Sequence, residues 1–79
     1  MKLRVYSLKE VLFEGEAKSL NLKTEIGEIT ILDQHRPLIT VLKEGPVKIT
    51  LVGGKEKFLK SAGGFLEVKP GNEVSVLIN

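Results

Sequence analysis

The stretch VKITLVGGKEKFLK, residues 47–60, indicates the class of fold of this chain. Apolar and polar side chains alternate over residues 47–51, as expected for a strand with one face in a core and one face in water. Gly53 and Gly54 follow, and such a pair supplies the positive φ angles that a tight hairpin requires. We therefore expect residues 55–60 to return as a second, antiparallel strand.

The same period of two recurs along the chain, around residues 3–5, 20–22, 29–31, 66–68 and 74–78. Glycines and prolines interrupt the runs, and Pro70-Gly71 is expected to turn the chain before the last of them. Short strands at this spacing predict an all-β fold, a flattened antiparallel sandwich or barrel. We expect its core to contain Leu3, Leu22, Ile31, Ile49, Phe58, Val68 and Val76.

One segment also has a helical signal. Ser7-Leu8-Lys9-Glu10 has the form of a capping box and precedes two apolar residues. A short helix over residues 8–14 is the alternative to a strand there, although Gly15 would end it within two turns and so short a helix is marginally stable alone.

Length and composition restrict the possible functions. The chain has 79 residues, which is one domain spanning 1–79, with 42% hydrophobic and 28% charged residues and a net charge of +2. This charge balance argues against a nucleic-acid-binding protein. The absence of cysteine excludes disulfides and thiolate metal sites. No apolar run approaches the ~20 residues of a membrane span, so we expect no direct membrane insertion.

No group of residues predicts catalysis. His35 is the only histidine, too few for a typical metal site, and no serine lies in a nucleophile-elbow motif. Gly63-Gly64 lacks the rest of a phosphate-binding loop and is expected to mark a bulge or a close approach of two strands. These observations favour a binding or structural module, with no catalytic residue, metal or cofactor.

The stretch GEITILDQHRPL, residues 27–38, resembles the G-E-x-G-I-L-x-x-H-x-P-L signature of the epsilon subunit of bacterial and chloroplast F-type ATP synthases. Four further motifs of that family occur in order: FEG at 13–15, LKEG at 42–45, GGFLEV at 63–68 and VSVL at 74–77. The chain departs from the family where Thr30 replaces a common glycine and where Asp33-Gln34 precedes the histidine. That loop is therefore expected to differ in shape from the loop of other members.

The resemblance implies a sandwich of about ten short strands in two sheets, without the helix at 8–14. It also implies a non-catalytic rotor subunit of the central stalk, which links the gamma subunit to the ring of c subunits and couples proton-driven rotation to ATP synthesis. Such a subunit would lie peripherally at the cytoplasmic face of the bacterial inner membrane. Most members continue into an inhibitory helical hairpin, and the present sequence ends at Asn79, before such a hairpin.

The family positions also imply contact residues. Those matching the gamma-facing surface are Ser7, His35, Pro37 and Thr40. Those matching the loop on the c ring are Glu25, Ile26, Gly27 and Glu28, where Gly27 would allow a turn that projects both carboxylates. A subunit between two partners should also expose apolar residues, and we expect Tyr6, Leu8, Ile39, Phe65 and Leu77 to be among them.

Two other functions have partial sequence signals. Residues 32–37 superficially look like a nucleotide motif of some epsilon subunits, but they align with the H-x-P-L loop, so we predict no ATP binding. The main alternative is a swinging-arm carrier domain of the biotinyl or lipoyl type. Such domains have this size and present a lysine at a hairpin, as Lys55 would be here, but the flanking residues of either carrier are absent.

Overall fold

A computed structural model describes all residues, 1–79, and consists of strands joined by turns and loops. The strands are β1 (Lys2–Tyr6), β2 (Val11–Thr24), β3 (Gly27–Leu32), β4 (Leu38–Leu42), β5 (Gly45–Leu51), β6 (Glu56–Ser61), β7 (Gly64–Lys69) and β8 (Glu73–Ile78). It contains no helix of the length and apolarity needed to cross a bilayer.

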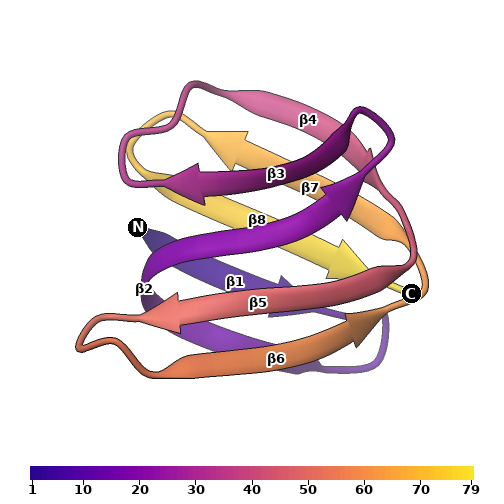
Figure 1. The fold of residues 1–79 in the computed structure, drawn as a ribbon, viewed down its shortest axis with the longest axis horizontal. Coiled ribbons are helices and arrows are strands. Elements are labelled where there is room, and N and C mark those ends of the chain that lie inside the picture. Colours follow the sequence, from indigo (N-terminus) through magenta and orange to yellow (C-terminus); the bar gives the residue numbers. More distant parts are fainter.

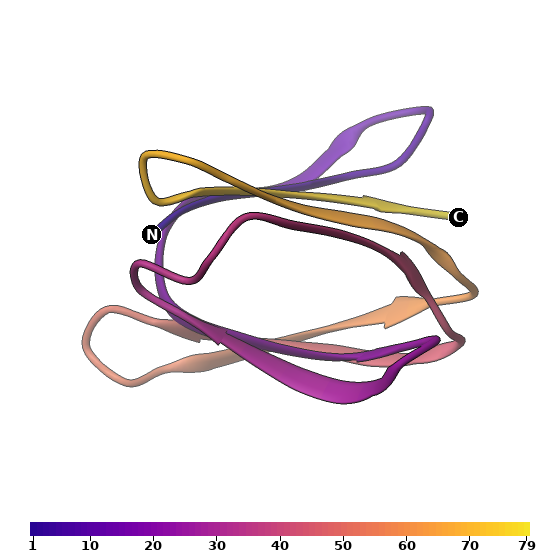
Figure 2. The same ribbon diagram turned by 90° about the horizontal axis from the view of Figure 1, so that it is seen from above.

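The strands form two facing layers, as predicted (Figures 1 and 2). The back layer consists of the first half of β2 followed by β1, β8, β7 and β4, and the front layer consists of β3, the second half of β2, β5 and β6. β2 passes through both layers, because its residues 11–16 pair with β1 and its residues 17–24 pair with β3 and β5.

Two details of the predicted topology are wrong. There are eight strands rather than about ten, partly because β2 runs unbroken for 14 residues. Gly15 does not end it, since its φ of 159° is close to extended backbone. The sandwich is also not wholly antiparallel: β1 and β8 pair in parallel, with Leu3 beside Val74 and Val5 beside Val76.

The turns follow their local sequences. Gly53-Gly54 joins β5 to β6 and Pro70-Gly71 joins β7 to β8, as predicted. The alternative helix over 8–14 is wrong. The Ser7 hydroxyl does accept the N–H groups of Lys9 and Glu10, at 3.2 and 3.3 Å, but the Ser7 N–H donates to the Glu10 carbonyl at 2.8 Å. This closes a hairpin turn between β1 and β2.

The core lies between the layers and is built from one face of each strand. Six of the seven core residues predicted from sequence are buried, and the exception is Phe58, which is 61% exposed. Phe58 pairs with Lys48, while its neighbour Leu59 pairs with buried Val47. Leu59 therefore faces the core and Phe58 points outward. The prediction for Phe58 was wrong because two adjacent apolar residues leave the direction of the alternation open.

Candidate functional site

The outer face of the back layer carries a row of apolar side chains that crosses five strand segments. Strand register places Val11 beside Tyr6, Tyr6 beside Leu77, Leu77 beside Phe65 and Phe65 beside Val41. We call these five residues the apolar row. Val11, Phe65 and Val41 are exposed, and Tyr6 and Leu77 are half-buried.

Two further apolar side chains extend this surface. Ile39 lies on β4 two residues before Val41, and Leu8, 91% exposed, lies in the turn that follows β1. All five residues that we expected to be accessible are thus exposed or half-buried. Val11 and Val41 were missed, although alternation along β4 could have indicated Val41, because it follows the outward-facing Ile39 by two positions.

The outer face of the front layer has a different character. Cross-strand pairs there join polar residues, such as Asn21 with Thr30 and Asn21 with Lys48. Phe58 is its large exposed aromatic residue, and it lies among charged side chains, since Lys48 and Glu56 form an ion pair at 3.6 Å. An apolar surface that spans several strands is therefore a property of the back layer.

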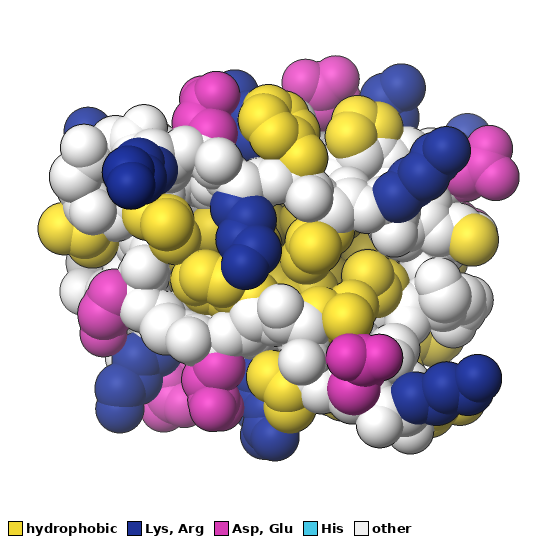
Figure 3. Space-filling model, turned by 90° about the horizontal axis from the view of Figure 1, so that it is seen from below, with side chains coloured by type: hydrophobic (Ala, Val, Ile, Leu, Met, Phe, Trp, Pro, Cys, Tyr) yellow, Lys and Arg dark blue, Asp and Glu magenta, His cyan; other side chains and the backbone are white.

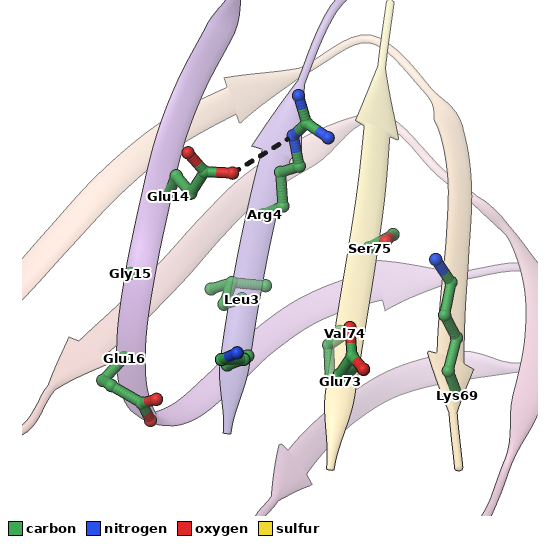
Figure 4. A pocket seen from close by; sticks show the side chains of 10 residues that line it. Leu3, Arg4, Glu14, Gly15, Glu16, Lys69, Glu73, Val74 and Ser75 are labelled. Atoms are coloured by element: carbon green, nitrogen blue, oxygen red, sulfur yellow. Dashed lines mark ion pairs between the residues drawn. The ribbon is translucent and has the colours of Figure 1, made fainter. Parts of the chain in front are cut away.

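A polar groove of about 440 Å³ is lined by residues of β2, β1, β8 and β7 (Figure 4). It adjoins the apolar row, because Arg4 lies two residues before Tyr6 on the same face of β1. The Arg4 guanidinium lies 3.5 Å from the Glu14 carboxylate and also stacks at 5.6 Å over the ring of Tyr6. Lys2, Lys69 and Glu73 carry further charges of both signs along the groove. Since the charges alternate across strands, the groove is largely self-neutralised, and it forms a charged border to the apolar row.

A third surface is the open side of the sandwich, where hydrophobic side chains gather in a hollow (Figure 3). It exists because β6 pairs only with β5, and the first half of β2 pairs only with β1. Half-buried Phe13, Leu51 and Leu59 pack against the core. The Lys57 ammonium lies 5.7 Å above the Phe13 ring, and an inward-pointing charge of this kind discourages pairing with another sheet edge.

The turn between β2 and β3 has the predicted position and is locally well built. The hydroxyl of buried Thr24 donates to the Gly27 carbonyl at 2.7 Å and accepts the Ile26 N–H at 3.2 Å. Gly27 has a φ of 118°, which favours glycine. Glu25 and Ile26 form the tip, and Ile26 is 70% exposed there.

Glu28 does not project from this tip as expected. It is the second residue of β3 and pairs with Lys23, on the outer face of the front layer. The Asn21 amide donates to the Glu28 carboxylate at 3.3 Å and to the Thr30 hydroxyl at 2.9 Å. Only Glu25 of the two carboxylates therefore stands at the tip, while Glu28 lies along the outer face of the sheet, where its side chain is exposed.

The four residues matched to the gamma-facing surface are not one cluster. Ser7 lies in the β1–β2 turn, at the same end of the sandwich as Glu25 and Ile26, whereas His35 and Pro37 lie in the β3–β4 loop at the other end (Figure 1). Thr40 lies midway along β4, paired with buried Leu66, and is half-buried on the inner face between outward-facing Ile39 and Val41.

His35 is half-buried and holds its own loop. Its Nδ1 lies 2.7 Å from the Arg36 carbonyl, and its backbone N–H donates to the Leu32 carbonyl at 3.2 Å. A carbonyl only accepts, so Nδ1 must carry a proton, and in the neutral ring Nε2 is then left as an acceptor for a partner.

The N-terminus meets the same loop through Asp33. The Met1 ammonium donates to the Asp33 carboxylate and to the Ala17 carbonyl, with Glu16 at 3.6 Å. The hydrogen bond from the ammonium and a second from the Asn72 amide lower the pKa of Asp33 below its ordinary value. Both favour the charged carboxylate.

Because the pKa of Asp33 is lowered in the folded state, the folded protein should lose stability as the pH falls. The contribution of Asp33 to stability is fully present above its unfolded pKa of about 3.9 and is lost as the pH falls through the lower folded value. We expect the difference in melting temperature between the wild type and Asp33→Asn to be constant from pH 7 to about pH 5 and to shrink below about pH 4. Thermal melts of both proteins at each pH check this. Glu44→Gln, at a carboxylate without an ion pair, is the control and should show no such convergence.

No cluster of three or more metal-ligating side chains is present. The hairpin that carries Lys55 is a plain two-strand connection between β5 and β6. The structure therefore has three kinds of surface that could bind a partner: the apolar row, the open side, and the turns at the two ends.

Comparison with known proteins places the chain in a family. The sequence profile of the ATP synthase delta/epsilon chain beta-sandwich domain matches residues 1–79. Among solved structures, a chain of the Euglena gracilis mitochondrial ATP synthase, resolved as OSCP/F1/c-ring, is similar with a TM-score of 0.92 and 23% identity, over 99% of this chain and 49% of that one. A chain from the central stalk/c-ring of the Tetrahymena thermophila mitochondrial ATP synthase gives 0.80 and 20%, over 99% and 62%.

These likenesses to solved structures establish the fold, and the chain spans about half to three-fifths of the length of the two matched chains. The profile match covers every strand, including the hairpin at Lys55, and leaves the carrier-domain alternative without support. The resemblance first indicated by residues 27–38 and 63–68 is thereby confirmed: the chain belongs to the delta/epsilon family of ATP synthase beta-sandwich domains.

Proposed function

We propose that this chain is a non-catalytic central-stalk subunit of a proton-translocating F-type ATP synthase, which ties the gamma subunit to the c ring so that rotation is coupled to ATP synthesis. The observation that carries the proposal is the family membership over residues 1–79, joined to the apolar row on the outer face of the back layer. The two solved relatives come from assemblies whose names include F1, the c ring and the central stalk. The subunit would be peripheral to the membrane, at the cytoplasmic face in a bacterium.

The physical basis of the gamma contact is the cost of exposed apolar area. Each Å² of apolar surface removed from water contributes about 25 cal/mol, so covering a row that crosses five strand segments would favour association with a partner. The charged groove along the row adds a polar rim, which is the usual anatomy of an interface. Ser7, His35, Pro37 and Thr40 are proposed to contribute polar or loop contacts to gamma.

The contact with the c ring is assigned to the turn of Glu25, Ile26, Gly27 and Glu28. An exposed isoleucine at a turn tip favours coverage by a partner, and carboxylates can accept charge-assisted hydrogen bonds from Arg or Lys in the loops of c subunits. Exposed ion pairs contribute about 0–1 kcal/mol, so these contacts set position more than affinity.

Co-purification tests the proposed function. The tagged chain, co-expressed with the gamma subunit of its own organism, should retain gamma through gel filtration as a complex identified by mass spectrometry. A chain that elutes alone, with gamma folded and present, would contradict the proposal.

A separate experiment tests which end of the sandwich faces the c ring, because Glu28 and Lys55 lie at opposite ends (Figure 1). In the assembled enzyme, Glu28→Cys should form a disulfide with cysteines placed in the loop of the c subunit, and Lys55→Cys should not. Efficient cross-linking from position 55 alone would reverse the orientation while leaving the stalk function intact.

A further inference from the structure

Three segments that are distant in sequence meet at Asn72, in the turn between β7 and β8. The Asn72 side-chain oxygen accepts the Gln34 N–H at 2.8 Å, and its amide nitrogen lies 3.4 Å from the Asp33 carboxylate. The Asn72 carbonyl accepts the Lys2 N–H at 3.0 Å. One side chain therefore connects the last turn of the chain to the β3–β4 loop, 38 residues earlier.

The hydrogen bond between Gln34 and Asn72 stabilises an unfavourable backbone conformation at Gln34. Gln34 and Asn72 are the two non-glycine residues with positive φ, each at 62°. Asparagine enters this region several-fold more readily than most residues, but glutamine lacks that preference. Gln34 is exposed, so packing does not fix it, and two hydrogen bonds stabilise its backbone there: the turn bond from His35 to Leu32 and the bond from its own N–H to Asn72.

The next residue after Gln34 is His35. Its backbone N–H closes the loop onto Leu32, and its ring bonds to Arg36 within the loop. The direction of the free Nε2 thus depends on the backbone angles at Gln34. Pro37 follows in the same loop and is exposed.

We propose that Asn72 is a positioning residue: its side chain holds residues 33–37 in one conformation and so presents His35 and Pro37 to the gamma subunit. This inference rests on the proposed function. Without the side-chain contact, the loop would populate several conformations, and the apparent affinity for a partner falls in proportion to the fraction that remains competent. A single hydrogen bond of ordinary net strength corresponds to a factor of about five.

The informative substitution is Asn72→Gly, because glycine keeps the positive φ of the turn and removes both side-chain contacts. We expect the hydrogen exchange of the Gln34 amide to accelerate about fivefold or more in the free protein, and the affinity for gamma to fall about fivefold. Pro70→Ala changes the same turn without a contact to the loop and should alter neither quantity. His35→Ala in the same binding assay reports whether the loop contacts gamma at all.

A double variant separates the effect on the conformation of the loop from the effect on the stability of the whole domain. The double variant Asn72→Asp/Asp33→Asn exchanges the carboxylate and the amide, so that position 72 can still accept the Gln34 N–H and position 33 can donate to it. It also removes the carboxylate that faces the Met1 ammonium. We expect a lower melting temperature than that of Asn72→Gly, together with wild-type protection of the Gln34 amide and wild-type affinity for gamma.

Two results would overturn the inference. The first is a Gln34 amide that exchanges equally fast in the wild type and Asn72→Gly. The second is unchanged gamma affinity in Asn72→Gly while His35→Ala weakens binding, which would mean that the loop acts in binding without needing Asn72. Failure of the wild type to bind gamma would instead contradict the proposed function, and the inference would fall with it even if the amide result showed that Asn72 orders the loop.

Discussion

Replacing Gly64 by alanine should leave the chain unfolded at room temperature. Gly64 begins β7, pairs with Ile78 and has a φ of 139°, which side chains rarely adopt. A Cβ atom there would fall 1.9 Å from the Leu77 carbonyl oxygen and 2.9 Å from its carbon. Both are backbone atoms of the neighbouring strand, so the clash is relieved only by separating β7 from β8.

The expected cost exceeds about 4 kcal/mol, in the range reserved for severe core disruption, and is comparable with the whole stability of a small domain. Gly53→Ala is the matched control, because Gly53 also has a positive φ, 104°, but no atom lies within 4 Å of the added carbon. That variant should fold and lose about 1–3 kcal/mol through backbone strain alone. Circular dichroism and amide dispersion of both proteins check the comparison. A Gly64→Ala protein that melts cooperatively near the wild-type melting temperature would contradict the prediction, because it would show that β7 and β8 can separate at little cost in free energy.

The period of two in the sequence was enough to predict strands, layers and hairpins, because each strand has a buried face and an exposed face. It could not predict that β1 and β8 pair in parallel, since this depends on which edges remain free after all other strands have paired. It also could not show that Gly15 lies inside β2, since a glycine that ends a strand and one within a strand in extended conformation look the same in sequence.

The positions of the candidate contact residues were likewise predictable from sequence only in part. The turn at Glu25–Gly27 was predictable because glycine supplies its positive φ. The orientation of Glu28 was not, because the amide of Asn21 reaches it only once β2 and β3 pair in a particular register. Likewise nothing local relates Asn72 to Gln34. Contacts between segments 38 residues apart depend on the closed sandwich, and the sequence pattern has no information on them.

The largest expected effect on binding is that of Phe65→Asp. Phe65 lies within the apolar row, between Leu77 and Val41, and it is 55% exposed, the most exposed of the five side chains. Aromatic residues near the centre of an interface commonly contribute 2 kcal/mol or more, and a carboxylate at that position would also have to be desolvated. We expect the affinity for gamma to fall at least about 30-fold, as measured by calorimetry or by retention on immobilised gamma.

Phe58→Asp is the control for this prediction, because the two aromatic residues are similarly exposed on opposite faces of one sandwich. Both substitutions place a residue of low strand propensity in a strand, so each should lower stability by about 1 kcal/mol, which is about 4–8 °C in melting temperature for a domain of this size. Only Phe65→Asp should lose gamma, since Phe58 is surrounded by Lys48 and Glu56 rather than by apolar neighbours. If Phe58→Asp abolishes binding and Phe65→Asp does not, gamma docks on the front layer, and the apolar row must be covered by something else.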